Sequence, residues 1–122
     1  MTADLRPTPL TDLEYHAKTS AVLASVEACV DAWLQQDLVD IDTQRTGGLL
    51  EMSFPNGSKI VLNTQPPLHE IWLAARSGGF HYKFIEGAWR DTRSGGELFE
   101  ALSVCASEQA GQPLHFAEAS SA

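Results

Sequence analysis

The sequence is poor in cysteine and has no long apolar run, and each absence excludes a class of protein. Its two cysteines, Cys29 and Cys105, lie far apart and outside any Cys-x-x-Cys or Cys/His motif, so neither a disulfide scaffold nor a zinc site is indicated. No apolar stretch approaches the roughly 20 residues that cross a bilayer. The first ten residues, MTADLRPTPL, lack the apolar segment of a secretory signal. We therefore expect a cytoplasmic protein without a membrane partner.

Basic residues are also scarce, and this shortage limits the choice of partner. The chain has 8 Lys and Arg against 16 Asp and Glu, a formal net charge of −8. Such a chain repels phosphate backbones, so we expect no nucleic-acid partner. Cations and basic protein surfaces are the better candidates. The acids are concentrated between Asp12 and Glu51, where eight of them face only two bases, Lys18 and Arg45.

The length and composition predict one domain with short extensions. A chain of 122 residues that is 43% hydrophobic can bury a core without disulfides or metals. We expect a loose lead-in over residues 1–10, which carries two prolines, then a domain over residues 11–112. Residues 113–122 are small and polar, and only Leu114 and Phe116 are suited to pack back on the domain.

Two segments show helical signals. Thr11 and Glu14 fit a capping box that opens a helix over about residues 11–36. Small or apolar residues recur along it at helical spacing in two stripes: Leu13, Ala17, Ala21, Ala24 and Ala28, and Val22, Val26, Val30 and Trp33. A second capping box, from Ser94 to Glu97, predicts a helix over about residues 95–110.

Between the helices the apolar residues alternate with a period of two, which indicates strands. The alternating segments are residues 38–42, 50–54, 59–63, 71–74, 80–84 and 88–91. Asn56-Gly57 is the strongest hairpin signal among the turns that separate them. The order predicts an α+β fold, a two-layer sandwich in which two helices pack on one face of an antiparallel sheet of about six strands. The other face is left to water.

The alternation assigns one tryptophan to that open face. Ile71 and Leu73 take the inward positions, so Trp72 points outward. A large aromatic residue on an exposed, rigid strand is a candidate partner-binding anchor, unless a loop or tail covers it. Asn63 and Gln65 can supply hydrogen bonds on the same face. The full set expected there is Glu51, Ser53, Val61, Asn63, Trp72, Ala74, His81 and Lys83.

The stretch NGSKIVLNTQPPLHEIWLAARSGGFHYKF, residues 56–84, resembles the central sheet of the frataxin family, whose bacterial branch is called CyaY. The most specific part is Asn63-x-Gln65-x-Pro67 followed by Ile71-Trp72-Leu73, and the resemblance spans about residues 13–112. It implies the two-layer fold expected above. It also implies association with the cysteine desulfurase and the scaffold protein of iron–sulfur cluster assembly, partly through an exposed sheet tryptophan, which is Trp72 here. We expect Asn63, Gln65 and His81, on the same face, to bind the partner together with Trp72.

The resemblance further implies weak iron binding through an acidic ridge on the first helix and first strand. The acids concerned, which we call the acidic edge, are Glu27, Asp31, Asp37, Asp40 and Asp42. Gathered carboxylates without basic partners offer hard oxygen ligands to Fe²⁺ or Fe³⁺. Bacterial frataxins tend to carry paired acids on this part of the helix, and Ala28 and Ala32 replace the second acid of each pair. The alternative is a solvated acidic face that only maintains solubility.

Three functions compete at this point. The first is an iron-binding accessory or regulatory protein of iron–sulfur cluster assembly, which we expect to be a monomer in the absence of iron. The second is a metal-independent acidic adaptor for a basic protein partner. The third is an enzyme such as a carboxylate-based ferroxidase, which requires a buried site with Glu-x-x-His ligands that the sequence lacks. We therefore expect no catalytic residues.

Overall fold

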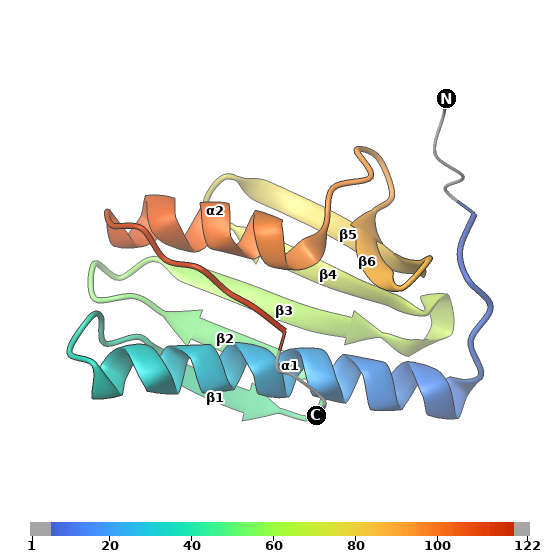
Figure 1. The fold of residues 1–122 in the computed structure, drawn as a ribbon, viewed down its shortest axis with the longest axis horizontal. Helices are drawn as coiled ribbons and strands as arrows, with labels where there is room; N and C mark the ends of the chain where they lie inside the picture. The colour runs from blue at the N-terminus through green and yellow to red at the C-terminus, as the bar shows by residue number, and fades with distance from the viewer. Residues whose placement is uncertain (1–5, 119–122) are drawn as a thin grey trace.

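The computed structural model describes residues 6–118 and shows two layers, with both helices on one face of a six-stranded sheet (Figure 1). The strands pair in sequence order and every pairing is antiparallel. The elements are α1 (Asp12–Gln35), β1 (Asp42–Thr46), β2 (Leu49–Ser53), β3 (Lys59–Gln65), the 3₁₀ turn η1 (Pro66–Leu68), β4 (Glu70–Ala75), β5 (Gly78–Ile85), β6 (Ala88–Asp91) and α2 (Leu98–Ala110). The expected α+β sandwich is confirmed.

The first helix begins at the expected capping box but buries only one of the two predicted stripes. The Thr11 hydroxyl accepts a hydrogen bond from the Glu14 amide, and the Glu14 carboxylate accepts one from the Thr11 amide. The stripe from Val22 to Trp33 is buried against the sheet. The stripe that begins at Leu13 is not, since Leu13 is 81% exposed. Bulky β-branched and aromatic residues, rather than the alanines, therefore set the face that packs.

The first strand begins four residues later than the sequence predicts. Residues 38–41 belong to the connection between α1 and β1, and β1 starts at Asp42. The reason is pairing: β2 ends at Ser53, which lies opposite Asp42, so the preceding residues have no strand beside them. Ile41 still packs inward and is 4% exposed. The alternation at residues 38–42 therefore indicates that one side of this segment faces the core, although the segment is not a strand.

The second helix also begins later than predicted, because its N-cap is Glu97 and not Ser94. The Glu97 carboxylate accepts hydrogen bonds from the amides of Phe99 and Glu100. The Ser94 hydroxyl instead accepts from the Gly96 amide within the loop. An isolated antiparallel bridge between Arg90 and Glu97 keeps Glu97 extended. The predicted capping box is therefore wrong.

The segment after α2 completes the core on the helical side. It runs between α1 and α2 across the sheet (Figure 1). Leu114 and Phe116 are 5% and 1% exposed, as expected from their apolar character. The Phe116 ring lies 4.7 Å from the Trp33 ring, centroid to centroid, and its amide donates to the Ser103 hydroxyl. This segment therefore bridges the two helices.

Within residues 6–118, no helix combines the length and the apolar character needed to cross a membrane. The two cysteines are unpaired: Cys105 is buried and Cys29 is half-buried on α1.

Candidate docking face and acidic edge

The open face of the sheet carries a row of three predicted partner-binding residues side by side. Asn63 of β3 pairs with Trp72 of β4, and Trp72 pairs with His81 of β5. Ile71 and Leu73, on either side of Trp72, are buried at 0% and 1% exposure. Residues directly opposite one another in an antiparallel sheet point to the same face. The predicted outward direction of Trp72 is therefore confirmed, and we call Asn63, Trp72 and His81 the docking row.

Within residues 6–118, the ring stack and the hydrogen bond of the half-buried Trp72 come from its neighbours in the sheet. The His81 imidazole stacks on the indole, with ring centroids 4.3 Å apart and planes 8° apart. The indole N–H donates to Glu70 Oε1 at 2.7 Å. The C-terminal segment as far as Glu118 packs between the helices, on the other face of the sheet. The indole is therefore held in one orientation, with its remaining surface open to solvent.

The fourth predicted residue, Gln65, lies at the end of β3, where α1 holds the strands together. Gln65 pairs with Glu70 across the β3–β4 ladder. The buried Tyr15 hydroxyl of α1 accepts a hydrogen bond from the Gln65 amide at 3.0 Å and donates to the Glu70 carbonyl at 2.6 Å. One tyrosine thus holds β3 and β4 together two residues along the ladder from the Asn63–Trp72 pair.

Sequence reasoning missed Glu70, which contacts both Trp72 and His81 of this row. Glu70 is 8% exposed and binds Trp72, while its second oxygen accepts from Lys83 Nζ at 3.1 Å. Burial raises the pKa of Glu70, but the hydrogen bonds from Trp72 and Lys83, with the charges of Lys83 and His81, outweigh it and leave that pKa below its ordinary value. Its position two residues before Trp72 was a usable signal, because both then point to the same face.

The acidic edge contains one salt bridge that the sequence did not reveal. Glu27 and Asp31 lie one turn apart on α1, as predicted. Arg45 of β1 is on the side of the strand that faces the helices and donates to Glu27 Oε1 at 2.9 Å. The expectation of carboxylates without basic partners is therefore wrong for Glu27. Its charge is partly compensated, whereas no salt bridge within residues 6–118 engages the other four acids.

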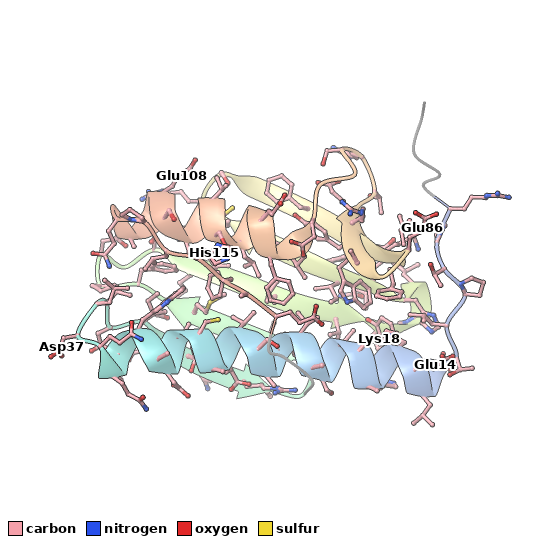
Figure 2. The ribbon with its side chains drawn as sticks, viewed as in Figure 1. Glu14, Lys18, Asp37, Glu86, Glu108 and His115 are labelled. Atoms are coloured by element: carbon pink, nitrogen blue, oxygen red, sulfur yellow. The ribbon has the colours of Figure 1, made fainter. Side chains whose placement is uncertain are left out.

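Those four acids do not share one surface. Asp31 is exposed on α1, and Asp37 lies just beyond its C-terminal end (Figure 2). Asp40 is exposed in the connection to β1. Asp42 pairs with Ser53, and it therefore belongs to the open face, on the opposite side of β1 from the helices. Edge strand β1 thus divides the acidic edge into a helical part and a sheet part.

This arrangement suits weak binding of a cation and not a fixed coordination site. Among residues 6–118, no three His, Cys, Asp or Glu side chains converge closely enough to hold a metal ion. The exposed carboxylates provide the hard oxygen donors that iron accepts, but water must complete the coordination. Such a surface attracts cations mainly through its negative potential.

Comparison with known proteins decides the family. The frataxin-like domain family matches residues 8–112 of the sequence. The chain belongs to the frataxin family. Relatives in Burkholderia mallei and Burkholderia pseudomallei, both called iron–sulfur cluster assembly protein CyaY, are 53% identical over 107 residues, which is 88% of this chain and 98% of theirs. The predicted resemblance is confirmed.

Solved frataxin structures share the fold. A frataxin from Psychromonas ingrahamii superposes with a TM-score of 0.78 at 31% identity, covering 89% of this chain and 100% of that one. Trimeric yeast frataxin from Saccharomyces cerevisiae, described as complexed with ferrous iron, has a TM-score of 0.63 at 23% identity and covers 89% and 94%. This frataxin family is not enzymatic, which confirms that expectation for the chain.

Proposed function

We propose that this frataxin-family protein is an iron-binding accessory and regulatory protein of iron–sulfur cluster assembly, which docks on the cysteine desulfurase and scaffold complex. Its relatives at 53% identity carry the name of iron–sulfur cluster assembly proteins. The observation that supports docking most strongly is the docking row, which presents an oriented indole on a rigid central part of the sheet. Aromatic residues of this kind dominate the energetics of protein interfaces.

The acidic edge supports the other two parts of the proposal, namely that the protein binds iron and that it attracts a basic surface of its partner. Asp31, Asp37 and Asp40 are exposed, and no salt bridge engages any of them in the described part of the chain. Their negative potential attracts Fe²⁺ or Fe³⁺ weakly and steers a positively charged protein surface towards the same end of the molecule. The docking row then supplies the contacts that hold the complex.

Charge reversal tests the steering role of the acidic edge. Asp31→Lys should weaken association with the cysteine desulfurase complex, mainly by lowering the association rate, and the loss should shrink as salt is added. Glu108→Lys is the matched control, because Glu108 is an exposed acid on α2, away from the acidic edge (Figure 2). Surface plasmon resonance at two salt concentrations measures both rates. Equal effects of the two reversals would show that only net charge matters.

A separate titration tests iron. Ferrous iron added under anaerobic conditions should broaden or shift the backbone NMR signals around Asp31, Asp37 and Asp40. Replacing all three with Asn should weaken the binding and raise the melting temperature slightly, because repulsion between like charges is removed. Unchanged iron binding in the triple variant would place the iron elsewhere.

A metal-independent acidic adaptor is the second candidate, and the split of the acidic edge favours it. No three-residue metal site forms in the described structure, and Arg45 already compensates Glu27. The adaptor hypothesis predicts that the triple variant loses partner affinity equally with and without iron. The iron-binding hypothesis predicts a larger loss when iron is present. Isothermal titration of the partner complex in both conditions separates them.

The same proposal includes a cytoplasmic location and a monomeric state in the absence of iron. The two unpaired cysteines suit a reducing compartment. Sedimentation of the apo-protein, and then of the protein with a several-fold excess of ferrous iron, tests the monomeric state.

A further inference from the structure

Glu70 is an unusual residue for its position. It starts β4 on the open face, where side chains meet water, yet it is only 8% exposed. A carboxylate is rarely buried to this extent unless charged or hydrogen-bonding partners surround it. Its neighbours across and along the strands, Trp72, His81 and Lys83, are what cover it.

The two carboxylate oxygens of Glu70 bind different partners. Oε1 accepts the indole N–H of Trp72 at 2.7 Å, and the Nδ1 atom of His81 lies 3.8 Å from the same oxygen. Oε2 accepts the ammonium of Lys83 at 3.1 Å. Lys83 also donates to the Leu68 carbonyl at 3.0 Å, which ties it to the turn before β4. Lys83 thus fixes the carboxylate through Oε2, and Oε1 holds the indole N–H of Trp72.

The bond to Glu70 and the stack on His81 restrict the indole in complementary ways. A hydrogen bond between residues i and i+2 of one strand draws the indole N–H back along β4. The stack, with planes 8° apart, fixes the tilt of the ring over β5. Without the acceptor, the indole regains side-chain rotamers that a partner must then order on binding, at a cost in affinity.

We propose that Glu70 is a positioning residue of the docking row, whose carboxylate holds the Trp72 indole flat against His81 so that the partner meets a preorganised aromatic surface. This inference rests on the proposed docking function for its effect on affinity. Its structural part does not, because the stack is a property of the free protein.

The experiment measures the stack and the affinity separately. In the free protein, at a fixed and mildly alkaline pH, the ring protons of His81 should show an upfield ring-current shift from the indole, which Trp72→Ala abolishes. Glu70→Ala should remove most of that shift and weaken binding of the cysteine desulfurase complex about tenfold. Glu70→Gln keeps an oxygen that accepts the indole N–H, so it should restore most of both.

Glu51→Ala is the matched control. Glu51 also points to the open face and also accepts from a lysine, Lys59 at 2.6 Å, but it lies on β2, two strands away from the indole on β4. The His81 shift and the affinity should stay near wild type in this variant. An equal loss in Glu51→Ala would show a general charge effect and would overturn the inference.

The outcomes separate this inference from the proposed function. If Glu70→Ala folds and retains the His81 shift, Glu70 does not position the indole, whatever the partner does. If Trp72→Ala binds the partner normally, the docking function fails while the stack can still depend on Glu70. Should Glu70→Ala fail to fold, Trp72→Phe tests the same contact, because phenylalanine lacks the N–H that Glu70 accepts. A His81 shift and an affinity that both survive in Trp72→Phe would then overturn the inference.

Discussion

Arg45 of β1 donates to Glu27 of α1 at 2.9 Å, and this contact joins the sheet to the acidic edge. Both side chains are 31% exposed, so solvent screens the pair, and its contribution to stability is about 0–1 kcal/mol. Its effect on the local potential is more important. It places a basic residue of the sheet beside the first carboxylate of the acidic edge.

Removing Arg45 should therefore strengthen iron binding. In Arg45→Gln the Glu27 carboxylate is released, and the local potential becomes more negative by one charge. We expect iron affinity to rise about two- to fivefold and the free energy of unfolding to fall by less than about 1 kcal/mol. Lys83→Gln, which breaks the salt bridge to Glu70 from β5, four strands away from β1, is the control and should leave iron affinity unchanged. Equal gains in the two variants would argue against a local site, and isothermal titration measures them.

The C-terminal segment should be essential for stability although it lies beyond the last helix. Phe116→Ala empties a site that is 1% exposed beside Trp33, so we expect a loss of about 3–5 kcal/mol. His115→Ala is the control from the same segment, where the side chain is exposed. It should change stability by no more than about 0.5 kcal/mol. Urea denaturation of both variants tests this, and a mild Phe116→Ala would mean that the segment packs loosely.

The pKa of Glu70 predicts one part of the acid sensitivity. It lies below its ordinary value of 4.5, so the folded protein holds the charged form more tightly than the unfolded chain does. The resulting stabilisation is complete above the ordinary value, and it is lost as the pH falls below that value and through the folded pKa. Glu70→Gln should lose less stability than wild type over this acidic range. Parallel slopes of unfolding free energy against pH in the two proteins would contradict the assignment.

The sequence predicted the features that follow from the alternation of apolar residues. It missed the features that depend on contacts between segments far apart in the chain. Alternation placed Trp72 outward and Leu73 inward, because strand geometry leaves only two directions for a side chain. The same alternation misplaced the start of β1, since pairing with Ser53 of the neighbouring strand determines where a ladder ends. Likewise, Ser94 and Glu97 have the spacing of a capping box, but the bridge from Arg90 holds Glu97 at the N-cap.

The candidate site also has a part that the sequence predicts and a part that it does not. The docking row follows from register, so its members could be named before the structure was known. The spacing of Glu70 from Trp72 also places it on the open face. Its role, like that of Arg45, could not be predicted, because each depends on a partner from a different element: Lys83 of β5 for Glu70 and Glu27 of α1 for Arg45. Long-range pairs between charged side chains leave no period in a sequence.

The most direct test of the docking proposal compares two adjacent residues of β4. Trp72→Ala removes an outward side chain and Leu73→Ala an inward one that is 1% exposed. We expect Trp72→Ala to keep the melting temperature close to wild type and to lose about 2 kcal/mol or more of binding to the cysteine desulfurase complex. Leu73→Ala should instead lose about 2–5 kcal/mol of stability, and the fraction that remains folded should bind normally. If Trp72→Ala binds the complex as tightly as wild type does, the docking row is not the interface and the proposal is wrong.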